Sequence, residues 1–230
     1  MAVINLIVPA SWDQLTQQQL RYACFLLSSG HYTREQMEAL TLIRWSKCLE
    51  GHVLPAPDRL APFLTQMEWL FNIPDTPVRL EEIHRAKAVH PMLRGVPFEH
   101  WLILENTYQG YLRTKQQHLI EDMTPYLYGH RIPLSAAEAY SIFLWMAAVK
   151  RLFAARFPHF FLPSPVTQEE PEDMHNSLRR NMNMQIRALT KGDITKEKEI
   201  LAMDTWRALT ELDAQAEEYE QIKKIHSHAK

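Results

Sequence analysis

The sequence is poor in glycine and cysteine, and each shortage excludes a class of protein. Only 6 of the 230 residues are glycine, so neither glycine-rich phosphate-binding loops nor the tight glycine turns of an all-β fold are expected. The 2 cysteines, Cys24 and Cys48, are too few for a disulfide framework, and they lack the Cys-x-x-Cys spacing of a zinc site. Both are expected to be small buried hydrophobic side chains.

The chain also lacks a long apolar run and a strong excess of one charge. The longest uncharged apolar stretch lies between Glu138 and Lys150, and it is shorter than the roughly 20 residues that cross a bilayer. Residues 1–11 are apolar, but they carry no basic segment and are too short for a signal peptide. A net charge of −2 does not favour general binding to polyanions. We therefore expect a soluble, cytoplasmic protein.

Capping patterns and apolar side chains three and four residues apart predict a mainly α-helical fold. Helix 135–157 is nearly apolar on all sides up to Lys150, which is typical of a central, buried helix. Residues 3–8 and 77–83 are candidates for one short two-stranded β element. The expected helices are 11–29, 33–51, 63–71, 98–128 (bent by Pro125 in its last turn), 135–157, 178–192, 193–203 and a last helix capped by Asp204.

An uneven distribution of aromatic residues divides the chain. Of the 9 Phe, 6 Trp and 8 Tyr, only Trp206 and Tyr219 lie beyond Leu162. Residues 163–173 combine three prolines with four acidic residues, which is typical of a linker. The sequence therefore predicts an aromatic-rich helical body (1–162), a linker (163–173) and an amphipathic helical arm (174–230).

Two apolar segments are predicted to bind a protein partner. The last helix carries an apolar stripe with Trp206 as its anchor, and this stripe must be buried against the body or against another chain. Phe160 and Phe161, between two prolines, either form an exposed hydrophobic hook or, if buried, close the body before the linker. The predicted binding residues are Trp206, Leu209, Leu212, Ala216, Tyr219, Phe160 and Phe161.

Motifs for catalysis are missing, so we expect a non-enzymatic protein with no cofactor. There is no Gly-x-Ser-x-Gly elbow and no Walker or dinucleotide fingerprint. A metal-dependent enzyme is the weaker alternative, because Glu-x-x-His is one element of the di-iron site in helical bundles. The competing interpretation is that these are surface side chains and that Glu105, with Gln109, fixes packing by accepting hydrogen bonds. The candidate metal ligands are Glu81, His84, Glu105, His118 and Glu121.

A second alternative is a DNA-binding regulator that uses residues 12–50. Two predicted helices and a short turn with a glycine are typical of a helix-turn-helix. Arg34 and Gln36 at the start of the second helix would read bases, although Glu35 and Glu38 would face phosphates unfavourably. The competing interpretation is a simple helical hairpin.

Three segments together resemble known sequences: 105–112 (ENTYQGYL), 155–161 (ARFPHFF) and 189–197 (LTKGDITKE). They resemble uncharacterised helical proteins that are encoded in prophage-like or mobile gene clusters of gut bacteria. Residues 195–199 and 206–209 also resemble small helical phage assembly proteins. The resemblance brings no catalytic motif and no established activity, and it implies an accessory or assembly role. The leading hypothesis is therefore a protein-binding or assembly accessory protein whose C-terminal arm binds a protein partner or mediates self-association.

Overall fold

The computed structural model describes residues 8–45, 63–161 and 171–228, and it confirms the mainly α-helical fold. Within these residues there is one β-sheet, formed by the short antiparallel strands β1 (Glu82–Ile83) and β2 (Ala86–Lys87). Three 3₁₀ helices are η1 (Trp12–Gln14), η2 (Thr65–Phe71) and η3 (Ile194–Lys196). The α-helices are α1 (Gln17–Ser29), α2 (Arg34–Trp45), α4 (Phe98–Thr114), α5 (His118–Glu121), α6 (Thr124–Tyr128), α7 (Ala136–Arg156), α8 (Pro171–Thr190), α9 (Glu197–Ala202) and α10 (Thr205–His228).

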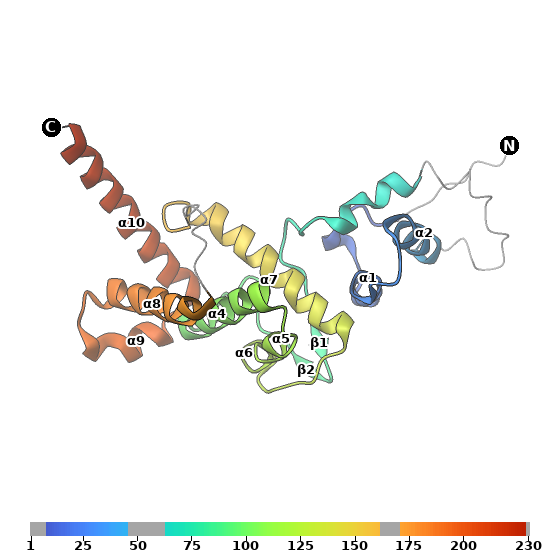
Figure 1. Cartoon of the computed structure of the whole chain (residues 1–230), viewed down its shortest axis with the longest axis horizontal. Coiled ribbons are helices and arrows are strands. Elements are labelled where there is room, and N and C mark those ends of the chain that lie inside the picture. Colours follow the sequence, from blue (N-terminus) through green and yellow to red (C-terminus); the bar gives the residue numbers. More distant parts are fainter. Residues whose placement is uncertain (1–7, 46–62, 162–170, 229–230) are drawn as a thin grey trace.

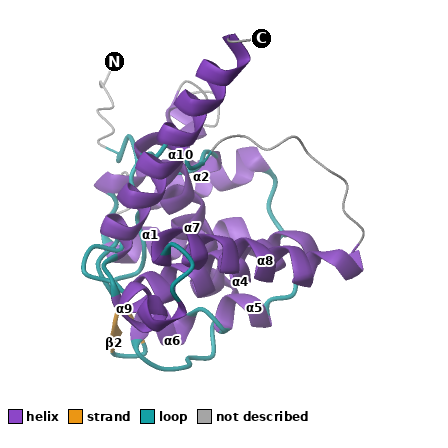
Figure 2. Cartoon of the chain, turned by 90° about the vertical axis from the view of Figure 1, so that its left-hand side faces the viewer, coloured by secondary structure: helices purple, strands orange, loops and turns teal. Residues whose placement is uncertain are grey.

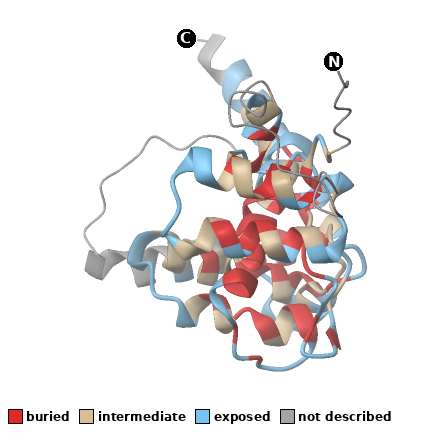
Figure 3. Ribbon diagram, turned by 90° about the vertical axis from the view of Figure 1, so that its right-hand side faces the viewer, coloured by how far each residue is buried: buried red, intermediate tan, exposed pale blue. Residues whose placement is uncertain are grey.

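Helix α7 is the centre of the fold, as its composition predicts. The Ser135 hydroxyl accepts a hydrogen bond from the Glu138 N–H, and the Glu138 carboxylate accepts one from the Ser135 N–H, so the predicted capping box starts the helix. Trp145, Met146 and Phe153 are fully buried. Figure 1 shows α7 crossing the middle of the molecule, with α1 and α2 on one side and α8, α9 and α10 on the other. Buried residues occupy the interior between these helices (Figure 3).

Helix α1 packs along α7 but begins later than predicted. Ser11 makes no capping hydrogen bond and opens only η1, because Leu15 is already extended. Thr16 and Gln19 repeat the same sequence pattern and form the capping box of α1. The predicted end at Gly30 is confirmed, with the left-handed φ of 64° that glycine adopts without strain.

Helix α2 begins at the predicted cap, and most of the helix predicted for 63–71 is tighter than an α-helix. The Thr33 hydroxyl accepts from the Gln36 N–H, and the Gln36 side chain accepts from the Thr33 N–H. Cys48 and the predicted stop at Gly51 lie outside the described residues. Most of the helix predicted for 63–71 is the 3₁₀ helix η2.

The single long helix predicted for 98–128 is wrong, because the chain forms α4, α5 and α6 there. Helix α4 ends where Lys115 adopts a left-handed φ of 57° and its N–H donates to the Tyr111 carbonyl. The Thr114 hydroxyl then accepts a hydrogen bond from the Gln116 N–H in place of a helical partner. Pro125 lies in the first turn of α6, where its missing N–H costs no hydrogen bond, so it starts a helix and does not bend one.

The β element differs from the predicted pairing of 3–8 with 77–83. Only Glu82–Ile83 of the second segment is a strand, and its partner is Ala86–Lys87. His84 and Arg85 in the connection both have positive φ angles, 48° and 69°, as a two-residue hairpin turn requires. Residues 3–7 lie outside the described part of the chain.

The first half of α10 is part of the same core as the body. Asp204 caps the helix as predicted, because its Oδ1 accepts from the Trp206 and Arg207 N–H groups. The Thr205 N–H donates to the Val96 carbonyl at 2.9 Å. Beyond this attachment, α10 extends away from the other helices, which Figures 1 and 2 show from two directions. Helix α8 already begins at Pro171, so residues 171–173 of the predicted linker are helical.

Candidate functional site

A groove of about 680 Å³ opens between α8 and α10, and it brings together most of the predicted partner-binding residues. Its walls come from α4, from the turn that follows α7, from α8 and from α10. Five of the seven predicted residues line it: Phe160, Phe161, Leu212, Ala216 and Tyr219. The hook and the stripe, which are distant in sequence, are therefore parts of one surface.

Asp213 of α10 holds the aromatic wall of the groove in place. Its Oδ1 accepts hydrogen bonds from the backbone N–H groups of His159 and Phe160, each at 2.8 Å. The rings of Phe160 and Phe161 meet edge to face with their centroids 4.8 Å apart, and the Phe161 ring lies 6.3 Å from that of Trp101. Both Phe side chains are half-buried. The segment is therefore neither the fully exposed hook nor the fully buried end of the body that the sequence analysis offers as alternatives.

The rim of the groove keeps large apolar side chains in solvent. Met184 of α8 is 60% exposed and Tyr219 of α10 is 69% exposed. Beyond the groove, Ile222 and Ile225 continue along α10 with exposures of 55% and 68%. Apolar side chains gathered in this way on one surface are typical of an interaction site.

Two polar side chains, Glu105 of α4 and Gln185 of α8, also line the groove. Glu105 Oε1 accepts from Lys150 Nζ at 2.5 Å and from Gln109 Nε2 at 2.9 Å, which confirms its predicted role as an acceptor that fixes packing. Glu105 Oε2 and Gln185 Oε1 are covered and accept no hydrogen bond from the described residues.

The other two predicted binding residues belong to the core of the chain itself. Leu209 is fully buried. The Trp206 ring packs edge to face against Phe153 and Phe157, with centroids 5.5 and 5.6 Å apart. Its Nε1–H donates to the Met92 carbonyl at 2.6 Å. Trp206 therefore anchors α10 to the body of the chain itself, whereas the sequence predicts it as the anchor for a partner.

Comparison with protein-family models, with curated proteins and with solved structures finds no match. No described helix is long and apolar enough to cross a membrane. The function is therefore argued from the geometry of the groove and the helices around it.

The five candidate metal ligands do not form a common site. Among the described residues, no group of three or more His, Cys, Asp and Glu side chains is placed to hold a metal ion. The Glu-x-x-His spacing puts two ligands on one face only in a helix, whereas Glu81 and His84 lie at the β1–β2 hairpin. Glu105 is in α4 and is engaged by Lys150. The remaining candidates, His118 and Glu121, are in α5.

The residues predicted to read DNA are occupied within the chain. Arg34 Nε donates to Glu38 Oε1 at 3.2 Å, and its guanidinium lies 4.6 Å from the centre of the Phe71 ring. The Gln36 side chain accepts a hydrogen bond from the Thr33 N–H at the start of α2. Helix α2 also packs against α1 and η2. The structure thus favours the helical-hairpin interpretation of residues 12–50 where it describes them.

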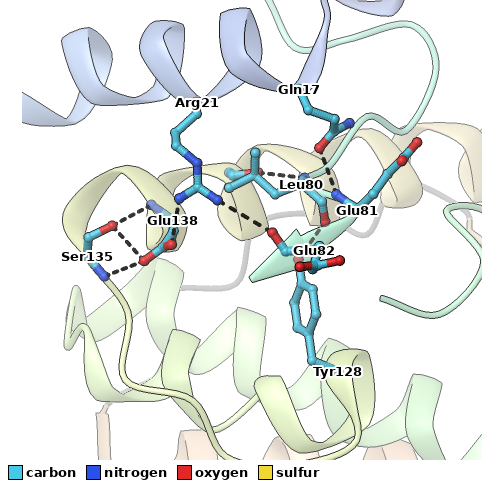
Figure 4. Close-up of polar contacts among 9 residues, drawn as sticks. Gln17, Arg21, Leu80, Glu81, Glu82, Tyr128, Ser135 and Glu138 are labelled. Atoms are coloured by element: carbon cyan, nitrogen blue, oxygen red, sulfur yellow. Dashed lines mark hydrogen bonds and ion pairs between the residues drawn. The ribbon is translucent and has the colours of Figure 1, made fainter. Parts of the chain in front are cut away.

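A polar network links α1 and the hairpin segment to the middle of the fold, and the sequence analysis missed it. Arg21 of α1 donates to Glu138 Oε1 at 2.6 Å, while Gln17 accepts a hydrogen bond from the Glu81 N–H at 2.8 Å (Figure 4). The Tyr128 hydroxyl donates to a backbone carbonyl of the same segment at 2.8 Å. The capping-box pattern identifies Glu138, but its partner Arg21 is 117 residues away and has no local signal.

Cys24, the only cysteine among the described residues, lies in the core. It is fully buried, as predicted for a small hydrophobic side chain. Burial raises the pKa of its thiol to about 12, so the reactive thiolate is scarce at neutral pH. Cys48 lies outside the described residues.

Proposed function

We propose that this chain is a non-enzymatic, cytoplasmic protein-binding or assembly accessory protein. Its binding surface is the groove between α8 and α10 together with the exposed end of α10. The occupant is a helix of a protein partner that presents apolar side chains. The resemblance of the sequence to prophage-encoded helical proteins supports an assembly role.

The convergence of separate apolar segments on one groove carries this proposal. The turn after α7 contributes Phe160 and Phe161, and α10 contributes Ala216 and Tyr219. The Asp213 side chain joins these two segments before any partner binds, so the aromatic wall is preorganised. Burying an exposed side chain such as that of Met184 under a partner helix contributes about 1.5–3 kcal/mol of favourable free energy to binding.

Site-specific photocrosslinking in cells tests the proposal. Replacing Tyr219 with the photoreactive amino acid p-benzoylphenylalanine is expected to give a defined crosslinked protein product. Tyr32 is the matched control position, because it is an aromatic residue that is 37% exposed but lies between α1 and α2, away from the groove. The same replacement at Tyr32 is expected to give no such product.

A change in the opposite wall of the groove makes this test specific. Met184→Glu adds an unpaired charge to the surface that the partner must cover, and it is expected to abolish the Tyr219 product. Ile194→Glu is the control, because Ile194 is 83% exposed and lies outside the residues that line the groove. Equal crosslinking from Tyr32 and Tyr219, or a Tyr219 product that persists in Met184→Glu, would contradict the proposed function.

A further inference from the structure

The C-terminal half of α10 separates its charges into two blocks. Residues 211–220 contain five acidic residues and no basic one, whereas residues 221–228 contain two lysines and no acidic one. Lysines near the C-terminal end of a helix are favoured by the helix dipole. The dipole gives no reason for acidic residues in the middle of the helix. Asp213 holds the turn after α7, and Glu220 Oε2 lies 3.4 Å from His159 Nδ1, whereas Glu211, Glu217 and Glu218 are exposed. The two blocks have opposite charge and similar length, so the segment is complementary to a reversed copy of itself.

The same segment carries apolar side chains that the body of the chain leaves exposed. Tyr219, Ile222 and Ile225 are each more than half exposed. They follow Leu212 and Ala216, which line the groove. The exposed end extends beyond the other helices, and Figures 1 and 2 agree on this.

We propose that a second copy of this chain covers this surface, with the two α10 helices antiparallel. This inference rests on the proposed function and names the partner for the same groove. In an antiparallel pair, the acidic block of each copy lies along the basic block of the other. Opposite charges therefore attract each other at both ends of the helix pair. In a parallel pair, acidic would face acidic and basic would face basic. The antiparallel arrangement also has a two-fold axis, which closes the assembly at a dimer.

The lengths of the acidic and basic blocks fit an antiparallel pairing of two α10 helices. Residues 221–228 form about two turns, roughly 12 Å of helix, beyond the acidic block. In the antiparallel pair this end lies beside the groove-lining stretch of the other copy. Ile222 and Ile225 then meet the Tyr219 rim, and Lys223 and Lys224 bring donors and positive charge to the acidic block.

Sedimentation of the full-length protein tests this inference. We expect a dimer at micromolar concentration whose dissociation constant rises with salt, because the charges that face each other are largely in solvent. Lys223→Glu combined with Lys224→Glu makes both blocks acidic and is expected to weaken the dimer about tenfold or more. Glu217→Lys combined with Glu218→Lys should weaken it similarly, since two positive charges then face the lysines.

A variant with all four changes is the decisive control. It exchanges the signs of the two blocks, so opposite charges face each other again, and dimerisation is expected to return to within about threefold of the wild type. Ile194→Glu changes an exposed isoleucine elsewhere and should leave the dimer intact. Circular dichroism of each variant shows whether its helices are retained.

Sedimentation and crosslinking together separate this inference from the proposed function. A monomer at all concentrations, or a dimer that the lysine changes leave unaltered, would overturn the second-copy inference. If the Tyr219 crosslink then joins a different protein, the proposed function stands without self-association. If Tyr219 gives no specific crosslink, the proposed function fails as well. A crosslink between two copies of the chain, lost in the lysine variant, supports both.

Discussion

Replacing Trp206 with alanine is expected to lower the free energy of unfolding by about 3 kcal/mol. The change removes the edge-to-face contacts with Phe153 and Phe157 and leaves a cavity beside them. It also leaves the Met92 carbonyl without the Nε1–H donor at 2.6 Å, and it removes the ring over which the Arg94 guanidinium lies at 4.5 Å. Urea denaturation followed by circular dichroism measures the effect.

Two further variants separate the role of Trp206 from that of the groove. Trp206→Phe keeps an aromatic ring but no N–H donor, so a smaller loss of about 1 kcal/mol is expected. Tyr219→Ala lies on the same helix at a position that is 69% exposed, and its free energy of unfolding should change by no more than about 0.5 kcal/mol under monomeric conditions. Equal destabilisation by Trp206→Ala and Tyr219→Ala would contradict the division of α10 into an attached half and a binding half.

The second large effect is expected at Glu138, whose replacement by alanine should cost about 2 kcal/mol at neutral pH. The variant loses the acceptor of the α7 capping box, which binds the Ser135 N–H at 3.0 Å and the Ser135 hydroxyl at 2.7 Å. It also loses the ion pair with Arg21, which contributes less because the Arg21 side chain is 45% exposed. Glu99→Ala, at an exposed glutamate in the first turn of α4, is the control and should change stability by no more than about 0.5 kcal/mol.

The loss of stability caused by Glu138→Ala should become smaller as the pH falls. Burial alone would raise the pKa of Glu138, but hydrogen bonds from Ser135 and Arg21 and the charge of Arg21 outweigh burial and lower the pKa below its ordinary value of 4.5. The ionised carboxylate therefore stabilises the fold fully above that value, and its contribution is lost as the pH falls through the lowered pKa. Wild type and variant should converge in this acid range. A difference in stability that stays constant from neutral to acid pH would contradict the assignment.

Local signals in the sequence predict much of the helical framework. The caps at Ser135 and Asp204 and the helix stop at Gly30 depend on residues a few positions apart, so the pattern contains the whole interaction. Failures occur where ordinary residues adopt left-handed backbone conformations. Lys115 ends α4 in this way, and His84 and Arg85 form the hairpin turn, although none of them is a glycine.

The groove could be predicted only in its parts. Periodicity identifies Ala216 and Tyr219, and the flanking prolines single out Phe160 and Phe161. Their convergence depends on hydrogen bonds from the turn after α7 to Asp213, which join residues more than fifty positions apart. Periodicity also does not distinguish the buried start of the α10 stripe from its exposed end. That difference depends on how far the body extends along the helix.

Hydrogen exchange of the full-length protein, followed by mass spectrometry at several concentrations, tests the central claim most directly. We expect amides of residues 205–213 to be as protected as those of α7 at every concentration, because this half of α10 belongs to the core. Amides of residues 219–228 should exchange quickly in dilute protein and become protected as the concentration rises. Fast exchange throughout 205–228, or protection of 219–228 that does not depend on concentration, would contradict the account.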